Sequence, residues 1–137
     1  MQRKASAIWQ GDLKSGKGSI STDSGTLKGA QYSFGTRFEN GVGTNPEELI
    51  AAAHASCFAM ALSAQLGERG ITPESVEATS TVTFENLILT RSELRATVKA
   101  RGADRKKIEE AAAAAKAGCP ISKVLNLEIT LDLTVST

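Results

Sequence analysis

The spacing of apolar and polar positions changes along the chain, and each spacing predicts a different kind of element. Weak alternation over Lys4–Trp9 and Ser19–Thr22 predicts two short strands, with the glycine-rich segment Gly11–Gly18 as the turn of a hairpin. Residues 32–38 (YSFGTRF) predict a third strand. We therefore expect β-structure before residue 40.

A long apolar segment follows a cluster of helix-starting residues. Asn45 is a favourable N-cap and Pro46 suits the first helical position, so we predict a helix that runs to about Arg69 and stops at Gly70. Between Leu49 and Leu66, fourteen of eighteen positions are apolar. A membrane span needs about 20 strongly apolar residues, so we interpret this segment as a buried helix.

A helix that is apolar on nearly all sides needs cover that one small sheet supplies on one side only. A second copy of the same helix would cover the rest. We therefore predict a homodimer, with an arrangement wholly within one chain as the alternative.

The rest of the chain completes an α+β pattern. Alternation predicts two long antiparallel strands over residues 76–84 and 87–100, and a closing strand over 128–136. Two helices are expected between these strands, at 105–117 after the N-cap Asp104 and at about 120–125. The chain has no repeat or evident linker, so we predict a single α+β domain over residues 1–137.

Composition and charge exclude several classes of function. Sixteen basic and fifteen acidic residues leave a net charge of +1, and aromatic residues are only 4%, which argues against a nucleic-acid partner. Two cysteines are too few for a disulfide-stapled secreted scaffold. Residues 1–10 (MQRKASAIWQ) do not resemble an export signal, so we expect a cytoplasmic protein without a membrane partner.

In the cytoplasm, a cysteine pair is more often redox-active or metal-binding than structural. Cys57 lies inside the long helix, and Cys119 lies at a predicted N-cap between Gly118 and Pro120, where a thiolate is favoured. Cys57 has no helix end beside it and would need a neighbouring cation, for which Arg37 is the candidate. The alternatives are two small buried hydrophobic residues and a surface arginine without a role.

His54 lies three residues before Cys57 on the same helix, a spacing that suggests a Cys/His general base. A histidine on an apolar helix is more often a satisfied core group, and we favour that interpretation. One histidine and two distant cysteines cannot fill a tetrahedral zinc site from one chain, so no metal is expected.

Three segments resemble one known family. Residues 43–49 (GTNPEEL) and 53–58 (AHASCF) look like the first cysteine motif of the OsmC/Ohr family, and residues 118–122 (GCPIS) resemble its second. His54 and the glutamate doublet are more similar to the OsmC subgroup. The order and spacing of elements agree over nearly the whole chain.

The resemblance implies an OsmC-like fold, with antiparallel curved sheets around a long buried central helix in an intertwined homodimer. It also implies a thiol-dependent peroxidase that reduces organic hydroperoxides, and hydrogen peroxide less well. Cys57 matches the peroxidatic cysteine and Cys119 the resolving cysteine, while Arg37 and Glu47 match residues around the reactive thiol. The implied reductant is a dithiol or a dihydrolipoyl group on a partner protein, and no bound cofactor is needed.

Helix geometry adds a constraint on this site. Glu47 and Cys57 are ten residues apart, which is roughly 15 Å along a helix axis. If both belong to one site, either the helix breaks between them or Glu47 comes from the other subunit. We predict the second arrangement, with two antiparallel central helices that exchange ends across a twofold axis.

Other functions remain open from the sequence. The protein could be a redox-sensing or binding module in which Cys57 oxidises once, a Cys/His hydrolase that uses Cys57 and His54, or a structural dimer with inert thiols. Phe38, Phe58 and Met60 are candidate apolar walls of a substrate site, although a core position is favoured for each.

Overall fold

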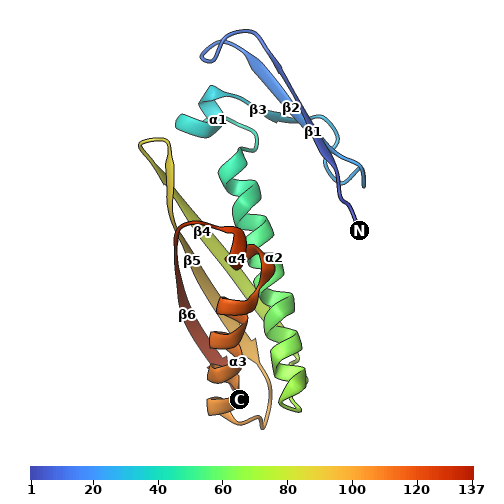
Figure 1. Cartoon of the computed structure of the whole chain (residues 1–137), viewed down its shortest axis with the longest axis vertical. Coiled ribbons are helices and arrows are strands. Elements are labelled where there is room, and N and C mark those ends of the chain that lie inside the picture. Colours follow the sequence, from blue (N-terminus) through green and yellow to red (C-terminus); the bar gives the residue numbers. More distant parts are fainter. The chain divides into compact units, whose positions relative to one another are not determined.

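The computed structural model describes all 137 residues, which form two compact units, Met1–Leu49 and Ile50–Thr137. Each unit has its own three-stranded sheet (Figure 1). The long helix α2, Pro46–Glu68, begins in the first unit and continues without a break into the second. The helix start predicted at Pro46 is confirmed.

The first unit is built on a β-hairpin. Strands β1, Ala5–Gln10, and β2, Lys17–Thr22, pair antiparallel, as the alternation predicts. Strand β3, Ala30–Tyr32, then pairs antiparallel with β2. This sheet carries the short segment that leads to α2.

The strand predicted over residues 32–38 is wrong. The chain leaves β3 after Tyr32 and forms a short helix, α1, over Phe34–Phe38. Ser33 caps this helix: its hydroxyl accepts the Thr36 N–H at 3.3 Å, and the Thr36 hydroxyl accepts the Ser33 N–H at 2.9 Å. These reciprocal hydrogen bonds satisfy donors that open a helical turn, which outweighs the strand preference of the aromatic residues.

The second unit has a mixed sheet with strand order β4–β5–β6. Strands β4, Ser75–Glu85, and β5, Ile88–Lys99, pair antiparallel as predicted. Strand β6, Glu128–Ser136, pairs parallel with β5, so the expectation of purely antiparallel sheets is wrong. The helices α3, Arg105–Gly118, and α4, Pro120–Val124, connect the two strands, and such a helical crossover returns the chain in its original direction.

The core of the second unit lies between one face of this sheet and the helices α2 and α3 (Figure 1). Alternate residues of β5 are buried, which is the pattern of a strand covered on one face. Every fourth residue of α2 from His54 to Leu66 is also buried. The largest apolar side chains of this core are Phe58, Leu62, Leu66, Leu94, Val98 and Ile108.

The remaining surface of α2 is largely uncovered within the chain. Met60 is 76% exposed, and the small residues that flank it on the same side of the helix, including Ala53, Ser56 and Gly67, are exposed as well. By length and composition α2 would also suit a membrane span, a property that the core helices of many soluble proteins share. The cover that the sequence predicts for most of this helix is therefore not supplied by its own chain.

Candidate active site

The two cysteines, 62 residues apart in sequence, meet in the second unit. Their sulfur atoms lie 2.9 Å apart and both thiols are free. Cys57 comes from α2 and is half-buried, whereas Cys119 is completely buried at the N-cap of α4. The predicted N-cap position of Cys119 is confirmed. A small molecule can therefore reach the Cys57 sulfur more readily than its neighbour.

The two sulfur atoms have different preferences for charge. Burial disfavours a thiolate at Cys119, but hydrogen bonds with Cys57, with the Ser122 hydroxyl and with the backbone N–H groups of Ile121 and Ser122 outweigh it and lower the Cys119 pKa. Burial and the hydrogen bond with Cys119 raise the Cys57 pKa instead. No cation is among the groups that act on Cys57 in this unit. An ionised Cys57 therefore needs a positive charge from elsewhere, as the sequence indicates.

Arg37 and Glu47, the other two predicted site residues, form an ion pair in the first unit. The Arg37 Nε and Nη2 atoms both donate to the Glu47 Oε1 atom, at 3.1 and 2.8 Å. The Glu47 side chain is 11% exposed and the Arg37 side chain 39% exposed. The carboxylate therefore fixes the direction of a guanidinium that still reaches solvent.

Asn45 and Gly43, in the segment between α1 and α2, bring this pair together. The Asn45 side-chain amide donates to the Thr36 carbonyl at 3.0 Å and ties the start of α2 to α1. The Asn45 Oδ1 atom also accepts the Glu48 N–H at 2.7 Å, which confirms the predicted N-cap. Gly43 has a φ of +139°, and a Cβ atom there would lie 2.6 Å from the Gln31 carbonyl oxygen, so the connecting loop requires glycine.

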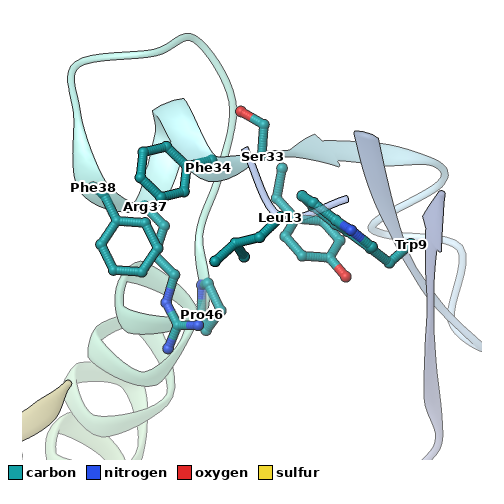
Figure 2. A pocket seen from close by; sticks show the side chains of 8 residues that line it. Trp9, Leu13, Ser33, Phe34, Arg37, Phe38 and Pro46 are labelled. Atoms are coloured by element: carbon teal, nitrogen blue, oxygen red, sulfur yellow. The ribbon is translucent and has the colours of Figure 1, made fainter. Parts of the chain in front are cut away.

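Arg37 also lines an apolar cavity of about 240 Å³ in the first unit (Figure 2). Two aromatic pairs, Trp9–Tyr32 and Phe34–Phe38, contribute to its wall, with ring centroids 5.5 and 4.7 Å apart. The remaining lining residues are Leu13, Ser33 and Pro46.

Of the three apolar residues considered from the sequence, only Phe38 lines this cavity. Phe58 belongs to the core and Met60 is exposed. The sequence gives no signal for the other walls, because Trp9, Leu13 and Phe34 come from separate elements that only the fold brings together.

His54 is completely buried, and each of its two ring nitrogens forms a hydrogen bond with a serine hydroxyl. Its Nδ1 atom lies 2.7 Å from the Ser92 hydroxyl and its Nε2 atom 2.8 Å from the Ser122 hydroxyl. Burial lowers its pKa, so the imidazole is neutral near pH 7. His54 is therefore the satisfied core group that the sequence favours, and neither nitrogen is left to act as a base for Cys57.

Comparison with known proteins identifies the family to which the protein belongs. The family model for OsmC-like proteins matches residues 38–134. The chain is 48% identical over 136 residues to Peroxiredoxin OsmC of Escherichia coli (strain K12), which covers 96% of this chain and 95% of that protein. The chain belongs to the OsmC family, and within it to the OsmC subgroup.

Other relatives share less of the sequence. The chain is 32% identical to the Organic hydroperoxide resistance protein OhrB of Bacillus subtilis (strain 168), over 85% of this chain and 88% of that protein. The crystal structure of B. subtilis OhrB matches with a TM-score of 0.68 at 26% identity, covering 96% of this chain and 98% of that one. An OsmC-like protein from Mycoplasma pneumoniae shares the fold, with a TM-score of 0.76 at 14% identity over 100% of this chain and 99% of that one. The α+β OsmC fold is thereby confirmed.

Proposed function

We propose that the protein is a thiol-dependent peroxidase that reduces organic hydroperoxides, and hydrogen peroxide less well, through Cys57 and Cys119. The observation that carries the proposal is the 2.9 Å contact between a half-buried and a completely buried thiol. The accessible Cys57 sulfur can react with a peroxide, and the buried Cys119 sulfur is close enough to attack the sulfenic acid that forms there. The names of the OsmC and Ohr relatives support the same activity.

The proposed peroxidase cycle has three steps. The Cys57 thiolate attacks the terminal oxygen of ROOH, the O–O bond breaks, and the alkoxide leaves and takes up a proton to form the alcohol. Cys57 is then a sulfenic acid. The Cys119 thiolate attacks this sulfur, hydroxide leaves and becomes water with one proton, and a Cys57–Cys119 disulfide forms. An external dithiol reduces the disulfide by thiol–disulfide exchange and becomes a disulfide itself.

In this proposal Arg37, which Glu47 holds in place, supplies the missing positive charge across a homodimer interface. The unbroken helix α2 separates Glu47 from its own Cys57 by about 15 Å, more than a glutamate side chain reaches. The Arg37–Glu47 pair of one chain therefore serves the Cys57 of the other. A second copy would also cover the exposed face of α2, which its own chain leaves open.

The walls of the cavity beside Arg37 favour an organic substrate. Aromatic and aliphatic side chains would bind the carbon chain of a hydroperoxide, while the guanidinium would bind its oxygen atoms. Hydrogen peroxide has no carbon chain to bury and gains nothing from these walls. The proposed reductant is a small dithiol or a dihydrolipoyl group on a partner protein, and the proposed compartment is the cytoplasm.

Intact-mass measurement tests the cysteine chemistry directly. Reduced protein receives one equivalent of tert-butyl hydroperoxide, in parallel with the Cys119→Ser and Cys57→Ser variants. We expect the parent protein to lose two hydrogen atoms and Cys119→Ser to gain one oxygen atom at Cys57. We expect the Cys57→Ser variant to keep its mass.

Two outcomes would overturn the proposal. Unchanged mass in parent and Cys119→Ser protein would mean that the thiols are inert. Oxidation of the parent without repeated consumption of peroxide in the presence of excess dithiothreitol would indicate a sensor that oxidises once.

A further inference from the structure

A continuous series of hydrogen-bonded polar side chains leads from β4 to α4, beside Cys119, and all of them except Ser80 are buried. It begins at Ser80, whose hydroxyl lies 2.8 Å from that of Ser92, and it continues through His54 to Ser122. Ser122 is the third residue of α4, whose N-cap is Cys119, so its hydroxyl lies at the same helix end as the Cys119 sulfur. There it lowers the Cys119 pKa, which favours the thiolate. The peroxidase cycle proposed above does not use any of these four side chains.

The donor and acceptor roles in this series of hydrogen bonds depend on one another, because each side chain has a limited number of protons to donate. A serine hydroxyl has one proton to donate, and a neutral imidazole has one donor and one acceptor nitrogen. When Cys119 is a thiolate it can only accept, so the Ser122 hydroxyl stabilises it only by donating its proton to the sulfur. Ser122 then accepts from the Nε2–H of His54, and Nδ1 accepts from the Ser92 hydroxyl. Only the tautomer of His54 that carries its proton on Nε2 satisfies this arrangement.

The opposite direction gives a different result at the sulfur. With the proton on Nδ1, His54 donates to Ser92, and its Nε2 atom accepts the Ser122 proton. Ser122 then has no proton for Cys119 and presents only lone pairs, which suit a thiol and repel a thiolate. The tautomer of His54 therefore decides which form of Cys119 the Ser122 hydroxyl stabilises.

We propose that His54 is a positioning residue for the resolving cysteine: through its Nε2–H it orients the Ser122 hydroxyl so that it donates to the Cys119 thiolate. The consequence for turnover rests on the proposed function, in which that thiolate attacks the Cys57 sulfenic acid and later leaves during reduction by the dithiol. Both steps need a stable Cys119 thiolate. The geometry thus gives His54 a role toward Cys119 and none as a base for Cys57.

Nuclear magnetic resonance of the unmodified protein tests the first half of this inference. His54 is the only histidine, so the imidazole ¹⁵N shifts of the labelled protein are unambiguous. In fully reduced protein, at a pH where Cys119 is ionised, we expect the tautomer with its proton on Nε2. A proton on Nδ1 under these conditions would overturn the proposal without the need for any variant.

The second half is tested by titration of Cys119 alone, in a Cys57→Ala background, through the ultraviolet absorbance of the thiolate. We expect Ser122→Ala to raise the Cys119 pKa by about 1, which is about a tenfold loss of thiolate well below the pKa. His54→Asn should raise it similarly, because the shorter amide does not reach Ser122. His54→Gln should restore the parent value, because its amide nitrogen can take the place of Nε2. Combining His54→Asn with Ser122→Ala should add little.

Ser56→Ala is the matched control, since this α2 serine is exposed and bonds only to the backbone carbonyls of its own helix. It should leave the titration unchanged. A raised pKa in Ser122→Ala but not in His54→Asn would mean that Ser122 acts without His54, against the proposal. None of these titrations uses peroxide, so their results do not depend on whether the protein is a peroxidase. If His54→Asn fails to fold, the tautomer measurement still decides.

Discussion

Mixing two impaired variants tests whether each active site is shared between chains. One variant, Cys57→Ser, lacks the reactive thiol, and the other, Glu47→Ala, lacks the carboxylate that holds Arg37. Because α2 runs unbroken from Pro46 to Glu68, we expect Glu47 to serve only the Cys57 of the opposite chain. A mixed dimer then contains one site with neither change and one site with both.

The expected activities follow from the geometry of the ion pair. Glu47→Ala removes two hydrogen bonds to a charged group, but the Arg37 side chain is 39% exposed and solvent screens part of the loss. A cost of about 1 kcal/mol at the transition state corresponds to about a fivefold lower rate. Cys57→Ser is expected to be inactive.

Random exchange of chains makes about half of the dimers mixed. Counting their complete sites together with the slow sites of the Glu47→Ala homodimers, we expect about 30% of parental activity per chain. A site formed within one chain would give the mean of the two variants, about 10%. The assay is hydroperoxide consumption with dithiothreitol, after the two variants have been unfolded and refolded together.

The control is a mixture of Cys57→Ser with Cys119→Ser. These cysteines touch within a single unit of one chain, so mixing should not restore disulfide formation. Activity near 10% in the first mixture would refute the shared site, provided that chain exchange is verified by mass spectrometry of differently tagged subunits.

Three further predictions concern substrate choice, stability and pH. Leu13→Ser removes an apolar wall of the cavity, so we expect a KM for cumene hydroperoxide about three- to tenfold higher, with hydrogen peroxide kinetics unchanged in the same steady-state assay. Phe58→Ala opens a void at a position with 0% exposure and should lower the free energy of unfolding in urea by about 3–5 kcal/mol; a cost below about 1 kcal/mol would contradict this core assignment. Burial lowers the pKa of His54 from its ordinary 6.5. Below pH 6.5 the imidazole is therefore protonated in the unfolded protein while it is still neutral in the folded protein. The stability that is fully present above pH 6.5 should fall by up to about 1.4 kcal/mol per pH unit below it, until the folded pKa is reached, and His54→Gln should remove this slope.

Local signals explain what could be predicted from the sequence. The start of α2 is encoded within a few residues, because Asn45 caps the helix and Pro46 suits its first position. The N-cap position of Cys119 follows in the same way from its place between Gly118 and Pro120. The sequence motifs around the two cysteines were sufficient to predict the family and the fold.

Non-local contacts explain what could not be predicted. The serine partners of His54 lie 38 and 68 residues away, and only the packing of α2 against β5 and α4 brings them to its ring. The direction of β6 depends on the helical crossover rather than on its own alternation. At Ser33 the signal was local but uncommon, since threonine takes the place in the capping box that glutamate or glutamine usually fills.

The distance of 62 residues between the two touching cysteines has a consequence for the newly made protein. A ribosome adds about 5–20 residues per second, so each nascent chain carries Cys57 for about 3–12 s before Cys119 has been synthesised. During this interval Cys57 has no resolving thiol in its own chain, and the proposed site still lacks the Arg37 of a partner chain, so the nascent protein is not yet a peroxidase. In the proposed cycle each copy therefore becomes active only after both cysteines have been made and two chains have assembled, and the copies completed before a peroxide stress are the ones that act first.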